Sequence, residues 1–141
     1  MGRALRGATM WGRRDEERVL KAREQLRFRL YAAVREVALG TELFRANFQL
    51  HEPEISISVY AHHVDVNASL SESQLRLVPI DGRPRVLNRF AEQLRNGMER
   101  AATTLELKLS EQPGRFGASE PVLVGEVPVG YHAVLLRSSP G

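Results

Sequence analysis

Residues His62, His63 and Asp65 are those whose types and spacing come nearest to a chemical site in this chain. His63 and Asp65 are two residues apart, so on a β-strand both side chains would point to the same face. Imidazole and carboxylate groups together are a common ligand set for zinc or iron. A complete site needs a further ligand. The residues that could supply it are His51, Glu52 and His132.

A second explanation of the histidine pair is geometric. Apolar residues occupy odd positions over 55–61 and even positions over 64–70, and the change falls at His62-His63. In one flat strand, this change would make half of those apolar side chains face solvent. Either a β-bulge or a tight hairpin would return both sets of apolar side chains to the core. The histidine pair lacks the Asn or Gly that favours tight hairpins. We therefore expect a bulge in one long, bent strand, with a metal site at His62, His63 and Asp65 as the alternative.

Basic residues near the N-terminus form the other chemically suggestive group. At 100° per residue, four of them lie along one side of a helix predicted over about residues 13–39. No acidic residue interrupts this side before Glu36. We call Arg14, Arg18, Lys21 and Arg29 the basic ridge. Together with Arg13 they are the candidate nucleic-acid-binding residues, because basic helices are common in nucleic-acid-binding proteins.

The competing interpretation of the basic ridge is a solvated helix face. Glu17 and Glu24 flank Lys21 at helical spacings that allow ion pairs, which would neutralise part of the ridge. A net charge of +3 permits a polyanionic partner without requiring one.

The composition and the missing motifs exclude several classes of site. The chain has no cysteine, which excludes disulfides, thiolate nucleophiles, iron–sulfur clusters and cysteine-ligated zinc. It also lacks the GxxxxGKS/T phosphate loop and the GxGxxG, GxSxG and HExxH motifs. The loop GRFGAS could bind an anion through backbone amides, but such loops are common flexible connections between strands. The sequence therefore favours a non-enzymatic binding protein without a cofactor.

The predicted first helix is long for a chain of 141 residues. Apolar residues recur every three or four positions from about residue 13 to Leu39, and Gly40 is a natural stop. Such a helix is about 40 Å long, which exceeds the width expected of a compact domain of this size. It must therefore project from the domain or pack against a second copy. We expect a homo-oligomer, a dimer or higher, which self-associates through this helix and the C-terminal strands.

The remaining pattern predicts an α+β fold. Apolar alternation favours strands over 43–50, 55–70 and 74–80. An apolar stripe predicts a second helix from about Pro84 to Ala102, in which Gly97 permits close approach. Residues 103–110 are expected to form a strand, with a continued helix as the alternative, and residues 122–137 one or two strands. The fold class is thus a long N-terminal helix, a mostly antiparallel sheet with a second helix packed on it, and C-terminal strands.

The expected organisation is a mobile basic lead over 1–12, one domain over 13–137 and a tail over 138–141. Either Met1 or Met10 could be the native start. The chain shows no secretory signal and no apolar run of about 18 residues. We therefore expect a cytoplasmic protein, not associated with membranes, whose partners are nucleic acid, a partner protein in an assembly, or copies of itself. The alternative is a small metal- or ligand-binding protein, conceivably an enzyme, centred on His62, His63 and Asp65.

Overall fold

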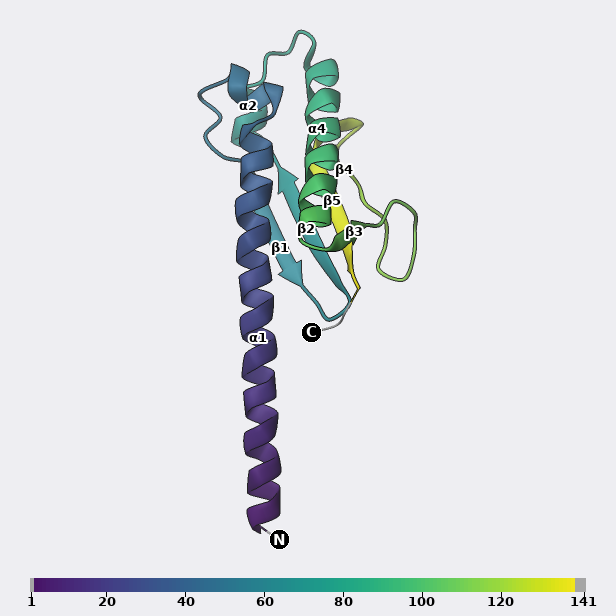
Figure 1. Ribbon diagram of the computed structural model, residues 1–141. Helices are drawn as coiled ribbons and strands as arrows, with labels where there is room; N and C mark the ends of the chain where they lie inside the picture. Colours follow the sequence, from purple (N-terminus) through teal and green to yellow (C-terminus); the bar gives the residue numbers. More distant parts are fainter. Residues whose placement is uncertain (1, 139–141) are drawn as a thin grey trace.

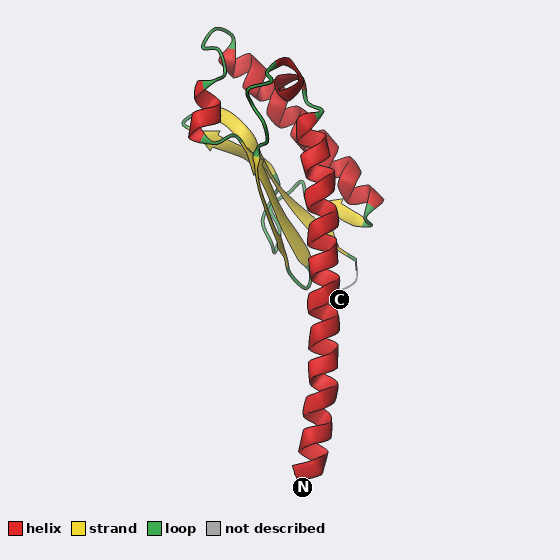
Figure 2. Cartoon of the chain, turned by 90° about the vertical axis from the view of Figure 1, so that its left-hand side faces the viewer, coloured by secondary structure: helices red, strands yellow, loops and turns green. Residues whose placement is uncertain are grey.

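The structure, a computed structural model, describes residues 2–138 of the chain and the side chains of residues 12–138. Two long helices lie on the same side of an antiparallel sheet, which confirms the predicted α+β class (Figures 1 and 2). The strand order is β1-β2-β5-β3, and β4 also pairs with β5. The elements are α1 (Gly2–Leu39), α2 (Glu42–Ala46), β1 (Glu54–Val59), β2 (His63–Ser69), α3 (Glu72–Arg76), α4 (Arg83–Thr104), β3 (Leu107–Leu109), β4 (Glu120–Val124) and β5 (Val127–Arg137).

Helix α1 is bound to the domain only along its C-terminal part. Leu30, Val34 and Ala38 are at most 1% exposed and face the sheet, whereas every side chain from Gly12 to Arg18 is exposed. The helix starts at Gly2, earlier than the predicted start near residue 13, and its 38 residues span about 57 Å. Figures 1 and 2 show its N-terminal part extending far beyond the sheet. We call residues 12–22 the projecting arm; the mobility predicted for residues 1–12 stays a prediction.

The predicted bulge at His62-His63 is wrong, because the chain forms a tight hairpin there. Strands β1 and β2 pair antiparallel up to Val59 opposite Val64. The Tyr60 N–H donates to the His63 carbonyl at 2.9 Å. Two bonds from the last strand support the turn: the Arg137 N–H donates to the His62 carbonyl at 2.9 Å, and the Arg137 guanidinium donates to the Tyr60 carbonyl at 2.7 Å. The hairpin therefore forms without Asn or Gly, since tertiary hydrogen bonds satisfy its carbonyls.

Two segments predicted as strands contain short helices instead. Residues 42–46 form α2, in which Leu43 and Phe44 are both buried, while Phe48, which the strand pattern would bury, is 87% exposed. Residues 72–76 form α3, which starts with a capping box: the Ser71 hydroxyl accepts from the Gln74 N–H, and the Gln74 side chain accepts from the Ser71 N–H. A capping box stabilises a first helical turn locally, so it overrides a short apolar alternation.

Helix α4 confirms the prediction of a second amphipathic helix, and Gly97 does face α1. A Cβ added at Gly97 would lie 2.9 Å from Cγ2 of Val37. The helix continues to Thr104, and the chain reverses at Glu106, which has a φ of 61°, before β3. For residues 103–110, the continued helix is therefore correct as far as Thr104, and the predicted strand is correct over Leu107–Leu109.

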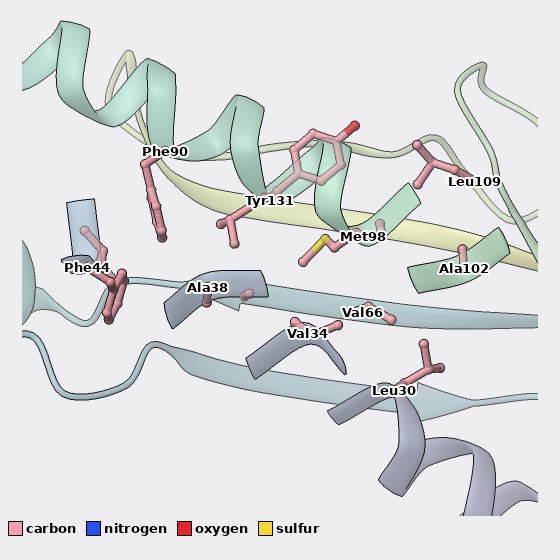
Figure 3. Close-up of a cluster of buried hydrophobic side chains, with 14 of the residues drawn as sticks. Leu30, Val34, Ala38, Phe44, Val66, Phe90, Met98, Ala102, Leu109 and Tyr131 are labelled. Carbon is pink, nitrogen blue, oxygen red and sulfur yellow. The ribbon is translucent and has the colours of Figure 1, made fainter. Parts of the chain in front are cut away.

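The C-terminal residues form two strands, and β5 is the central one. Gly125, with a φ of 64°, lies at the turn between β4 and β5. The core fills the space between the helices and the sheet: Figure 3 shows Leu30 and Val34 of α1 facing Val66 of β2, with Met98 of α4 beside Tyr131 of β5. Most of the predicted tail, residues 139–141, lies outside the described residues.

Candidate functional site

The five candidate nucleic-acid-binding residues are all exposed on α1. Arg13, Arg14, Arg18 and Lys21 lie on the projecting arm, where the rest of the domain does not reach (Figure 1). Arg29 lies further along, beside the C-terminal end of α4, where it lines a hollow together with Ala101. The structure therefore divides the basic ridge into three arm residues and one residue next to the domain.

The cations of the ridge have few partners. Within residues 12–138, no ion pair or hydrogen bond is formed by the side chains of Arg13, Arg18, Lys21 or Arg29. Glu24, which could have neutralised Lys21, pairs with Arg27 instead, and the hydrogen bond from Arg27 lowers the pKa of the Glu24 carboxyl. The charges of Arg13, Arg18, Lys21 and Arg29 are thus available to an anionic partner.

Arginines of the domain itself are in a different situation. Arg35 lies 2.6 Å from Glu52, Arg76 lies 2.9 Å from Glu72, and Arg89 lies 3.3 Å from Glu42. Arg95 contacts both Glu99 and Glu111. The domain therefore neutralises these four arginines internally, whereas the side chains of Arg13, Arg18 and Lys21 on the arm form no such bond among the described residues.

The arm also carries acids, and their positions matter. Asp15, Glu16 and Glu17 are exposed on the same turns of α1 as the cations. At 100° per residue, Arg14, Arg18 and Lys21 fall within a sector of about 60° that contains none of the three acids. The arm thus presents a narrow cationic edge rather than a large net charge.

His63 and His132 lie on the opposite face of the sheet from the helices. His63 Nε2 lies 3.6 Å from one carboxylate oxygen of Asp65, and His132 Nε2 lies 3.6 Å from the other. The pairing of β2 with β5 explains these distances. It places Asn67 directly opposite His132, so Asp65, two residues before Asn67 on the same face of β2, is the diagonal neighbour of His132. The structure therefore brings His63, Asp65 and His132 together, and it leaves His62 exposed in the hairpin turn.

The ring of His63 is packed between two aromatic rings. Its centroid lies 4.7 Å from that of Tyr60 and 4.2 Å from that of Phe116, and both pairs are stacked. Its side chain is 15% exposed, and its Nδ1 is buried without a hydrogen-bond partner among the described residues. The sequence interpretation missed Phe116, which lies in the loop GRFGAS. The available signal was that Phe116 is the only aromatic residue between Phe90 and Tyr131.

Among the described residues, no three His, Asp or Glu side chains are arranged to hold a metal ion. The metal alternative at His62, His63 and Asp65 stays a prediction. None of the described helices is both long enough and apolar enough to cross a membrane. Compared with family models, curated protein sequences and solved structures, the chain shows no significant match.

Proposed function

We propose that this chain is a non-enzymatic binding protein that contacts the phosphate backbone of nucleic acid through the projecting arm. The observation that carries the proposal is that three cations of the arm are unpaired among the described residues, whereas several arginines of the domain are paired with acids. Arg13, Arg18 and Lys21 have no partner among residues 12–138, whereas Arg35 and Arg76 are each bonded to an acid. Each phosphate that such a cation neutralises releases condensed counterions, which favours binding.

The shape of the arm favours duplex DNA as the nucleic acid. A helix with its side chains is about 10–12 Å wide, and the major groove of B-DNA is about 12 Å wide and admits one helix. The arm is exposed over residues 12–18 on all sides, so a groove can enclose it. Because Asp15, Glu16 and Glu17 lie outside the cationic edge, we expect this edge to face one phosphate strand and the acids to face away from it. A cytoplasmic location, expected from the sequence, belongs to the same proposal.

Salt dependence of binding tests the proposal. Four phosphate contacts, from Arg13, Arg14, Arg18 and Lys21, predict that log K falls against log salt with a slope of about −3.6 on a 24-base-pair duplex, at about 0.9 per contact. Arg18→Glu with Lys21→Glu should halve the slope to about −1.8 and weaken binding to every sequence equally. Fluorescence anisotropy at 50–300 mM NaCl measures both quantities, and a single-stranded RNA of equal length shows whether a duplex is required.

The matched control reverses two exposed arginines of the domain, Arg45→Glu with Arg85→Glu. It changes the total charge by the same amount, so its slope should stay near that of the natural chain. No binding at 50 mM NaCl, or equal slopes for the two double variants, would contradict the proposal. The arm would then be a solvated helix face, and an interaction with a partner protein would become the leading function.

A further inference from the structure

Arg23 is a basic residue on the side of α1 that faces the sheet. It lies seven residues before Leu30, about two helical turns, so both side chains project from nearly the same side of the helix. Leu30 is fully buried in the core, and Arg23 is half-buried. The Nε atom of Arg23 is buried without a hydrogen-bond partner, and its guanidinium forms no ion pair with any described residue. Unlike the exposed cations of the ridge, Arg23 therefore holds its charge against the domain.

Arg137 reaches the same end of the core from the sheet. It follows Tyr131, Ala133 and Leu135 at every second position of β5, and these three residues belong to the core, so Arg137 is on the helix-facing side of the strand. One nitrogen of its guanidinium donates to the Tyr60 carbonyl at 2.7 Å. Figures 1 and 2 show the C-terminal end of β5 at the end of the sheet from which the arm projects. The hydrogen bond to Tyr60 thus fixes this guanidinium beside the hairpin.

The guanidinium groups of Arg23 and Arg137 lie close enough to repel each other. Burial lowers the pKa of Arg137, and the charge of Arg23 lowers it further. The acids nearest to Arg23 on the helix do not compensate: Glu24 is paired with Arg27, and Glu16 is about 10 Å away along the helix axis. Since arginine stays charged in proteins, the fold keeps two like charges together in a half-buried place. An anion between them would offset the repulsion and accept hydrogen bonds from both groups.

We propose that Arg23 and Arg137 form a binding site for a phosphate group at the base of the projecting arm. A phosphate has a tetrahedral set of oxygens, so it can accept from two planar guanidinium forks that approach from different sides. At 100° per residue, Arg23 lies about 180° from Arg14 around the helix. The site is therefore separate from the cationic edge, and it does not rest on nucleic-acid binding by the arm.

Thermal unfolding in phosphate tests the site. The midpoint is measured by circular dichroism at pH 7 in 50 mM sodium phosphate and in NaCl of the same ionic strength. An anion that binds only the folded chain raises the midpoint, and a dissociation constant of about 5 mM predicts a rise of about 3–5 °C. Arg23→Gln, which keeps a polar side chain but removes the charge, should lose most of this rise. In NaCl this variant should unfold at no lower temperature than the natural chain, because one of the two repelling charges is gone.

The matched control is Arg45→Gln, which removes one exposed arginine elsewhere on the domain. Phosphate also stabilises folded proteins without binding to a site, and this control should keep the full rise. Arg23→Lys should keep only part of it, since the ammonium group has the charge but not the planar fork. An equal rise for the natural chain and for Arg23→Gln would overturn the proposal. Arg23 would then only cover the end of the core with its aliphatic stem.

Binding to a 24-base-pair duplex distinguishes the two sources of the phosphate. If the group belongs to a nucleic-acid backbone, Arg23→Gln should make the slope of log K against log salt shallower by about 0.9. If it belongs to a small phosphate ester, the slope should not change, while the thermal effect of phosphate is still lost in the variant. The thermal test contains no nucleic acid. A phosphate effect that depends on Arg23 in a chain that binds no duplex would support this site and contradict the function proposed for the arm.

Discussion

Gly97 of α4 and Val37 of α1 are packed with no room for a side chain between them: a Cβ on Gly97 would lie 2.9 Å from Cγ2 of Val37 and nearer still to Cγ1. This contact sets the spacing of the two helices, because helix–helix distance depends on the side chains at the crossing point. It also shapes the groove on the outer side of the helices, since Gly97 and Val37 both line it.

Replacement of this glycine should therefore destabilise the fold. Alanine in a helix interior normally adds up to about 1 kcal/mol of stability over glycine, but overpacking costs about 1–3 kcal/mol. We expect Gly97→Ala to lower the free energy of unfolding by about 1–2 kcal/mol in urea titrations, and Val37→Ala in the same chain to relieve part of that loss. Gly12→Ala is the control, because a Cβ there meets nothing within 4 Å; equal stability of the two alanine variants would contradict the steric argument.

The two histidines of the hairpin should differ in their effect on stability. Changing His63 to alanine removes its stacked contacts with Tyr60 and Phe116. Each aromatic pair contributes about 0.5–1.5 kcal/mol to stability. We expect His63→Ala to lower the free energy of unfolding by about 1–3 kcal/mol. His62→Ala should cost less, about 0.5 kcal/mol, because the His62 ring is exposed and makes a single, longer stacked contact, with its centroid 6.4 Å from that of Phe116. Urea unfolding measures both, and equal losses would show that the stacking does not matter.

Neither histidine substitution should affect nucleic-acid binding. The hairpin lies at the end of the sheet from which the arm projects, and the arm extends well beyond it (Figures 1 and 2). Anisotropy titrations at 100 mM NaCl should give the same affinity for the natural chain and for the His62→Ala, His63→Ala double variant. A large loss of affinity in that variant would move the binding site to the hairpin.

Tyr131 should make the fold sensitive to alkaline pH. Burial raises the pKa of the Tyr131 hydroxyl, and the nearby Arg95 guanidinium opposes this in part. The unfolded chain then releases this proton at lower pH than the folded chain does, so the contribution is intact below a pH of about 10, the ordinary tyrosine value, and is lost as the pH rises through the folded-state pKa. We expect the stability advantage of the natural chain over Tyr131→Phe to shrink from about pH 10 upward; urea titrations between about pH 8 and pH 11 measure the difference. A constant difference over this range would contradict the raised pKa.

The capping box of α3 should contribute measurably to stability. Ser71→Ala removes the acceptor for the Gln74 N–H, and the loss of such a cap costs about 1 kcal/mol. Ser73→Ala is the control, because among the described residues the Ser73 hydroxyl contacts only that of Ser71, at 3.1 Å. A smaller loss for Ser71→Ala than for Ser73→Ala would show that the cap is not used in solution.

The sequence by itself determined the long elements and their faces. The apolar stripe of α1 is buried from Leu30 onward, as the helical period predicts. The length of that helix predicted either projection from the domain or packing against a second copy, and the structure shows that it projects (Figure 1). The change from odd to even apolar positions at His62-His63 correctly indicated a local break in the strand. These features depend on the periods of helices and strands, which neighbouring residues encode without reference to the rest of the chain.

Only the tertiary structure decided what happens at that break. A bulge and a hairpin produce the same change of parity, so the pattern could not distinguish them. The hairpin forms because Arg137, 75 residues after His62, donates its N–H to the His62 carbonyl and its guanidinium to the Tyr60 carbonyl. In the same way, the meeting of Asp65 with His132 and the stacking of Phe116 on His63 depend on the position of β5 and of the loop before it. Such contacts follow from the pairing of distant strands, and no local spacing records that pairing.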